Sequence, residues 1–164
     1  MSLASPRSLF FLAFLACLAM MGGALYLEHV VGLEPCPLCI VQRMCVMAFG
    51  LFALLAALHN PGRGGRRAYA GLTFLSAAAG AAAACRQIWI QNTPPDPMAS
   101  CMPSNFDYML ENLPFQEFVS RVLHGTADCA EVTWTLFGMS LAEWCLLAFV
   151  GMVIFSAYQF LRRA

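Results

Sequence analysis

The sequence contains no lysine, and charged residues make up only 11% of its 164 residues, compared with about 25% in a soluble domain. Nine arginines are balanced by nine acidic residues, so the formal net charge is zero. This balance excludes a nucleic-acid-binding protein built on a basic surface. The low charged fraction also excludes a long disordered tail. Hydrophobic residues make up 60% of the chain, which predicts a protein that resides in the lipid bilayer.

Four apolar runs are long enough to cross a bilayer as helices, which needs about 20 residues each. They cover approximately residues 9–27, 40–58, 68–90 and 141–161. The first run is longer than the hydrophobic region of a signal peptide, which favours an uncleaved span. The sequence therefore predicts an all-α membrane protein, a four-helix transmembrane bundle formed by a single integral-membrane domain, residues 1–164.

The arginines predict the orientation of these spans. Six of them flank the spans at the N-terminus, in the segment 59–67 or at the C-terminus: Arg7, Arg63, Arg66, Arg67, Arg162 and Arg163. All nine acidic residues fall in the other two loops or at their edges. Because short arginine-rich loops stay in the cytoplasm, we expect both termini and the 59–67 loop there. The loops of about residues 28–39 and 91–140 then lie on the outer side.

The second outer loop has helical patterns of its own. Ser104 followed by Asp107 resembles a capping box that begins a short helix. After Pro114, apolar residues recur at helical spacing from Phe115 to Leu123, with polar residues opposite. This stretch is too short to span a membrane and is typical of a helix that lies in the interface. Packing against another part of the loop is the alternative.

The eight cysteines divide evenly between spans and outer loops. Cysteines within spans usually act as small apolar side chains, and four fall there: Cys17, Cys45, Cys85 and Cys145. The other four lie in the outer loops: Cys36, Cys39, Cys101 and Cys129. In an oxidising compartment these four should form two disulfides. Three pairings are possible, and the spacing does not select one of them.

Cys36 and Cys39 form a Cys-x-x-Cys motif directly before the second span. A disulfide in so small a ring restricts the unfolded chain little, so the spacing favours a redox-active pair over a structural one. Pro37 suits the first position of a helix and places Cys39 in the first turn, where the helix dipole stabilises a thiolate. Arg43 follows on the same face and either adds positive charge or anchors the helix end at the interface.

The cysteines allow three other interpretations. Covalent haem attachment requires a histidine after the second cysteine, where this chain has Ile40. A four-cysteine zinc site is disfavoured because Cys101 and Cys129 are far apart in sequence and the outer compartment favours oxidation, so no metal is expected. Two purely structural disulfides, which would brace the outer loops of a protein without enzymatic activity, remain an alternative.

Three motifs together resemble the DsbB family of quinone-coupled disulfide-forming membrane proteins. The first motif is Pro35–Cys39 followed by Gln42 and Arg43, and the second is Pro97–Cys101. The third is Gly125–Glu131, followed by Trp134 and Gly138. The resemblance covers nearly the whole chain, with four spans, two outer loops and two cysteines in each loop.

The resemblance implies a quinone-dependent protein thiol oxidase in the bacterial inner membrane. It would reoxidise a periplasmic DsbA-type thioredoxin-like protein and pass the electrons to the membrane quinone pool, either ubiquinone or menaquinone. Cys101 matches the cysteine that forms the mixed disulfide with DsbA, and Cys129 matches its partner. Cys36 matches the cysteine that exchanges with the second loop, and Cys39 matches the thiolate that contacts the quinone. Arg43 matches an arginine implicated in quinone binding.

The chain departs from the family pattern at two places. Gln42 stands where other members have an acidic residue before the arginine. Some members also have a histidine near the outer end of the third span, where this chain has Arg86 and Gln87, so we expect one of these two at the quinone site. A quinone reductase similar to vitamin K epoxide reductases is the other enzymatic alternative. There the Cys-x-x-Cys motif lies late in the bundle, whereas here it precedes the second span.

Overall fold

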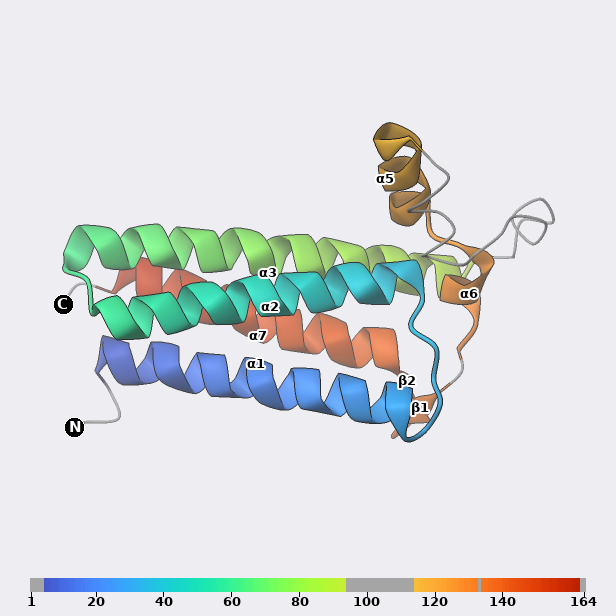
Figure 1. Ribbon diagram of the computed structural model, residues 1–164, viewed down its shortest axis with the longest axis horizontal. Coiled ribbons are helices and arrows are strands. Elements are labelled where there is room, and N and C mark those ends of the chain that lie inside the picture. Colours follow the sequence, from blue (N-terminus) through green and yellow to red (C-terminus); the bar gives the residue numbers. More distant parts are fainter. Residues whose placement is uncertain (1–4, 94–113, 133, 163–164) are drawn as a thin grey trace.

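The computed structural model describes residues 5–93, 114–132 and 134–162 (Figure 1). Four long helices run up and down in a bundle: α1 (Pro6–His29), α2 (Pro37–His59), α3 (Arg63–Gln91) and α7 (Leu141–Leu161). All four are long and apolar enough to cross a membrane. The predicted four-helix transmembrane bundle is therefore confirmed.

Local sequence signals explain where three of these helices begin. Ser5 caps α1 with its side chain, and Pro6 occupies the first position. Cys36 is the N-cap of α2 and Pro37 follows it, as the sequence predicts. Ser140 and Glu143 form a capping box at the start of α7.

Helix α3 is longer than the apolar run within it. Its 29 residues extend about 43 Å, which exceeds the hydrocarbon thickness of about 30 Å. The loop predicted over 59–67 is consequently much shorter, because α2 ends at His59 and α3 begins at Arg63. The helical conformation continues because the first turns of α3 have partners: Arg66 is buried and donates to the carbonyl oxygen of Arg162, at 3.0 Å.

Each long helix packs mainly on its neighbour in sequence, α1 on α2 and α2 on α3, while α7 packs on α3. Small residues let α3 approach both partners closely. Ala77 and Ala84 are fully buried, and a Cβ added at Gly80 would lie 2.1 Å from the ring of Phe149 on α7. Helix α3 therefore joins α2 to α7, while α1 is attached mainly through α2.

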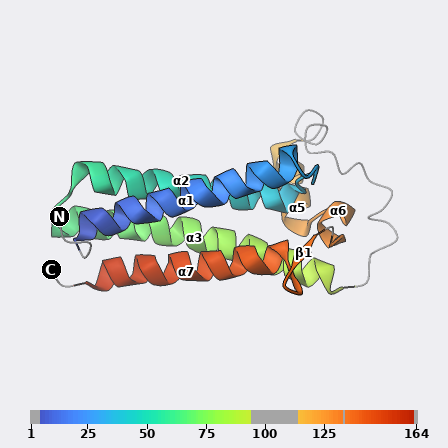
Figure 2. The same cartoon turned by 90° about the horizontal axis from the view of Figure 1, so that it is seen from below.

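The two ends of the bundle differ. Both termini lie at one end, where the ring of Phe10 on α1 meets Phe155 on α7 at 5.7 Å between centroids (Figure 2). The other end carries α5 (Phe115–His124), α6 (Ala127–Ala130) and an antiparallel hairpin of β1 (Thr135–Leu136) and β2 (Met139–Ser140). We call it the loop end.

The predicted helix after Pro114 is confirmed as α5, which projects sideways from the loop end of the bundle (Figure 1). Its location in a membrane interface stays a prediction. The helix expected to begin near Ser104 falls outside the described residues. The hairpin between α6 and α7 was not predicted, because its two-residue strands are too short to show an alternating pattern.

Candidate active site

Three thiols meet at the loop end of the bundle. The Cys36 Sγ lies 3.1 Å from the Cys39 Sγ, which is in the first turn of α2. Cys36 also packs with Cys129, on α6, in one buried cluster. Cys129 is completely buried and Cys36 nearly so. Cys36 therefore joins the first loop to the second, while Cys101, the fourth predicted site cysteine, lies outside the described residues.

Gly125 allows the second loop to settle on the ends of α2 and α3. Its φ of +80° is a conformation that other residues rarely adopt. A Cβ at this position would also lie 2.4 Å from the Ile90 Cδ1 and 3.4 Å from the Leu38 Cδ1. Helix α6 follows this point of close approach and places Cys129 beside Cys36.

Hydrogen bonds favour the thiolate at Cys129 and the thiol at Cys36. The pKa of Cys129 is lowered to about 6, chiefly by the hydrogen bond from the Cys36 thiol and further by backbone N–H groups of Leu38 and Thr126. The pKa of Cys36 is raised because its proton is held between Cys129 and Cys39, and burial acts in the same direction. A thiolate that faces a partner sulfur is the species required for disulfide exchange.

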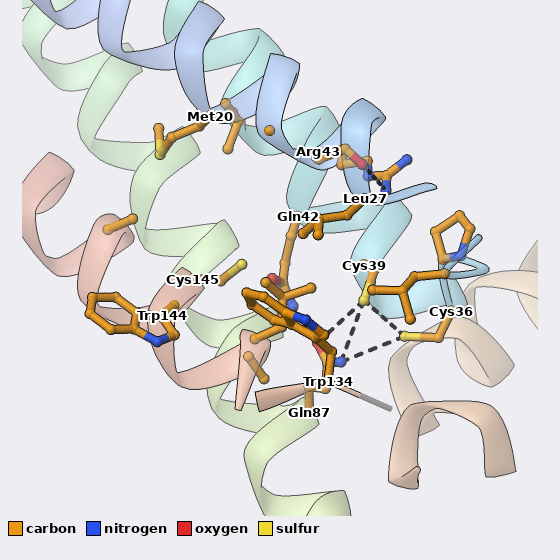
Figure 3. Close-up of a pocket in the computed structure, with 18 of the residues that line it drawn as sticks. Met20, Leu27, Cys36, Cys39, Gln42, Arg43, Gln87, Trp134, Trp144 and Cys145 are labelled. Atoms are coloured by element: carbon orange, nitrogen blue, oxygen red, sulfur yellow. Dashed lines mark hydrogen bonds between the residues drawn. The ribbon is translucent and has the colours of Figure 1, made fainter. Parts of the chain in front are cut away.

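A cavity of about 490 Å³ lies beside Cys36 and Cys39, within the size range of small-molecule sites (Figure 3). Apolar side chains from the loop-end halves of α1, α2 and α7 form most of its wall, together with Trp134 and Trp144. Gly23 on α1 and Trp144 on α7 line it and are also exposed. The cavity therefore reaches the surface between α1 and α7, whose ring contact lies at the opposite end of the bundle.

Four polar side chains from the long helices line this cavity: Gln42, Arg43, Gln87 and Gln91. Arg43 forms an ion pair with Glu28 on α1 and donates to the Ala24 carbonyl oxygen at 3.4 Å. Glu28 is the residue opposite Arg43 that the sequence does not reveal. The cavity thus combines an apolar wall with a few fixed polar groups beside a pair of thiols.

The sequence is similar to that of known proteins over its full length. The family profile described as "Disulfide bond formation protein DsbB" matches residues 6–159. "Disulfide bond formation protein B 1" of Pseudomonas aeruginosa is 61% identical over 164 residues, which cover 100% of both chains. "Disulfide bond formation protein B" of Stutzerimonas stutzeri is 60% identical over 163 residues, 99% of each chain. The corresponding protein of Hahella chejuensis is 46% identical over 157 residues, 96% of this chain and 94% of the relative.

The chain belongs to the DsbB family. The family resemblance of the three motifs is therefore confirmed. Membership identifies an oxidoreductase of disulfide bond formation, and the four apolar helices make it a multi-pass membrane protein.

The structure distinguishes the two α3 residues that were candidates for the cavity of this DsbB-family protein. The amide of Gln87 lines the cavity and faces the thiols: its Nε2 lies 3.4 Å from the Cys39 Sγ and 3.7 Å from the Cys36 Sγ. The guanidinium of Arg86 instead donates to the His124 carbonyl oxygen at 3.2 Å, which connects α3 to α5. Gln42, on α2, donates to the Gln87 Oε1 at 2.7 Å.

Sequence reasoning missed the connection between Gln42 and Gln87. Uncharged polar residues within apolar runs were the available signal, since such residues in membrane helices commonly face the bundle interior. Their partnership depends on the register between α2 and α3, which no spacing within one helix provides.

Proposed function

We propose that this protein reoxidises the dithiol of a periplasmic DsbA-type thioredoxin-like protein and passes the two electrons to a membrane quinone. One observation carries the proposal: Cys36 packs with Cys129 of the second outer loop and also lies 3.1 Å, sulfur to sulfur, from Cys39 at the cavity wall. Electrons that enter at the second loop can thereby reach the cavity through successive disulfide exchanges.

The route consists of disulfide exchanges that balance in electrons and protons. The partner's two thiols reduce a Cys101–Cys129 disulfide through a mixed disulfide at Cys101, and the partner leaves oxidised. The Cys129 thiolate then attacks Cys36 of a Cys36–Cys39 disulfide, and Cys39 leaves as a thiolate. Attack by Cys101 on the new Cys36–Cys129 bond restores the loop disulfide. Cys36 and Cys39 then hold the two electrons and two protons.

The cavity fits a quinone head group. It is mainly apolar, it offers two indole rings beside a flat ligand, and Cys39 forms part of its wall. Arg43, held by Glu28, supplies a polar group that a quinone oxygen requires, and Gln87 lines the same wall beside Cys39. A bound quinone supplies an acceptor for two electrons and two protons. Ubiquinone and menaquinone share this chemistry. Arg86 would act indirectly, by holding α5 against α3.

We further propose that the chain forms one domain in the bacterial inner membrane with both termini in the cytoplasm. Arg63, Arg66 and Arg67 lie in the first turns of α3, near the termini. Acidic residues such as Glu34, Asp128 and Glu131 lie at the loop end. The arginine bias supports a periplasmic location for the loop end, where a thioredoxin-like partner would meet it. The amphipathic helix α5 would then lie in the outer membrane interface.

Replacing Cys39 by Ser tests this function. Purified protein is mixed anaerobically with reduced DsbA and a soluble ubiquinone analogue, and quinone absorbance is followed. We expect Cys39→Ser to lose quinone reduction while its Cys101–Cys129 disulfide is still reduced by DsbA, because the exchange at the second loop precedes Cys39. Cys85→Ser, at an exposed position of α3, is the matched control and should retain full turnover. Turnover in Cys39→Ser at the wild-type rate would overturn the proposal.

A further inference from the structure

The buried amides of Gln42 and Gln87 form a pair across the α2–α3 interface. Gln42 is 4% exposed and Gln87 is 7% exposed. The Gln42 Nε2 donates to the Gln87 Oε1 at 2.7 Å. A glutamine amide has a donor end and an acceptor end. Since the acceptor end of Gln87 is occupied by Gln42, its donor end is directed elsewhere.

That donor end faces the thiols (Figure 3). The Gln87 Nε2 lies 3.4 Å from the Cys39 Sγ and 3.7 Å from the Cys36 Sγ, whereas the Gln87 Oε1 is 3.7 Å from the Cys39 Sγ. The amide atom of Gln87 nearer to the Cys39 Sγ is therefore its nitrogen, which donates a hydrogen bond to the sulfur. Rotating the amide by half a turn would present an acceptor to Cys39 and set two donors, from Gln42 and Gln87, against each other.

The arginine expected to stabilise Cys39 is directed toward another helix. Arg43 makes its ion pair with Glu28 and its other hydrogen bond with Ala24, both on α1. Arg86 donates to a carbonyl oxygen of α5. At the sulfur itself the structure places a neutral amide, and a hydrogen bond to a charged acceptor is stronger than one to a neutral acceptor.

We propose that Gln42 is a positioning residue that keeps the donor end of Gln87 directed at Cys39 and so maintains its thiolate. This role deepens the proposed function, in which Cys39 is the last sulfur to carry electrons. Gln42 acts through Gln87, because its amide bonds the acceptor end of Gln87, and of these two amides it is Gln87 that hydrogen-bonds Cys39. Loss of either residue removes the same hydrogen bond.

The test measures the reactivity of Cys39 in the fully reduced, quinone-free protein. Each variant is treated with iodoacetamide at neutral pH, and alkylation of every cysteine is followed by peptide mass spectrometry. We expect Gln87→Met to slow alkylation of Cys39 by about fourfold or more, since a hydrogen bond to a charged group is lost and the higher nucleophilicity of the less stabilised thiolate offsets only part of that loss. Gln42→Met should slow it by a comparable factor. Cys85 on α3 serves as the internal reference in the same molecules.

The double variant Gln42→Met/Gln87→Met separates positioning from a general structural effect. If Gln42 acts through Gln87, the double variant is no slower than Gln87→Met alone. Gln91→Met is the matched control: Gln91 lines the same cavity but accepts a hydrogen bond from Ser140, so Cys39 should keep its wild-type rate. Gln42→Asn keeps the amide on a shorter side chain and should slow alkylation of Cys39 as Gln42→Met does. It replaces Gln42→Met in the test if Gln42→Met does not fold.

Wild-type reactivity of Cys39 in Gln42→Met, or a double variant in which the two effects multiply, would overturn the inference. Equal slowing in Gln91→Met would overturn it as well. The assay contains neither quinone nor partner protein. A wild-type protein that fails to reduce quinone would therefore contradict the proposed function and leave this test of Gln42 intact.

Discussion

Gly125→Ala is expected to release the second outer loop from the bundle. Gly125 combines a φ of +80° with contact between the loop and the ends of α2 and α3. Alanine introduces two separate costs at this position. Its side chain disfavours the left-handed backbone conformation, and its Cβ would lie 2.4 Å from the Ile90 Cδ1. Because Cys129 follows four residues later, both costs oppose the contact between Cys129 and Cys36.

The two costs can be estimated from general values. The left-handed conformation costs an L-residue roughly 1–2 kcal/mol. Overpacking against Ile90 adds about 1–3 kcal/mol, the lower part of this range applying if the end of the isoleucine side chain rotates away. The sum of about 2–5 kcal/mol increases the open population of the loop at least about thirtyfold, since about 1.4 kcal/mol corresponds to a factor of ten.

Alkylation of Cys129 in the reduced protein measures this open population, because Cys129 is 0% exposed when the loop is docked. Gly125→Ala should accelerate alkylation at least about thirtyfold. In Gly125→Ala/Ile90→Val the clashing Cδ1 is absent, so only the backbone cost remains and the acceleration should fall to roughly 5–30-fold relative to Ile90→Val alone. Gly138→Ala has a similar backbone conformation, φ +81°, with no atom within 4 Å of the new Cβ. It should leave Cys129 at the wild-type rate. Unchanged alkylation in Gly125→Ala would refute the reasoning.

Two further predictions concern the same end of the molecule. The pKa of Cys129 is lowered to about 6, so its contribution to loop docking is absent below that pH and grows as the pH rises toward 9. Protease protection of the second loop in the reduced protein should increase over this interval, and Cys129→Ala should abolish the increase. Phe137 occupies the first central position of a two-residue hairpin turn with a φ of 53°, followed by Gly138 at 81°. Asparagine tolerates this conformation, so Phe137→Asn should stabilise the hairpin by about 1 kcal/mol, seen as slower amide exchange at Met139, whereas Phe137→Ala should not.

The bundle and its thiol motif could be predicted because their signals lie within single segments. Four apolar runs mark four helices, and the arginines mark their ends. Pro37 indicates the start of α2 and so places Cys39 in the first helical turn. Each of these features depends on residues a few positions apart. The length of α3 was underestimated for a related reason: hydropathy marks where a chain enters the hydrocarbon, whereas a helix ends where its backbone hydrogen bonds end.

The contacts between segments could not be predicted in this way. Glu28 follows the first apolar run, and a charged residue at that place is typical of a loop. It nevertheless pairs with Arg43 on α2. Gln42 and Gln87 are separated by 45 positions and meet only because α2 and α3 pack in one register. Arg86 and Gln87 are adjacent in the sequence but point to different partners, since successive residues of a helix are rotated by about 100°. A prediction based on spacing alone cannot choose between them.

The order of the three sulfurs gives the proposed electron transfer a direction. Cys36 contacts both Cys129 and Cys39, so in the proposed transfer the Cys129 thiolate would attack Cys36, and Cys39 would be the sulfur that leaves. A leaving sulfur must accept negative charge. Cys39 does so in the first turn of α2, near the positive end of the helix dipole, with an N–H of Gln87 directed at it. Once both cysteines are reduced, Cys36 keeps its proton because its pKa is raised. Of the two cysteines that line the cavity, the negative charge would therefore develop at Cys39 rather than at Cys36.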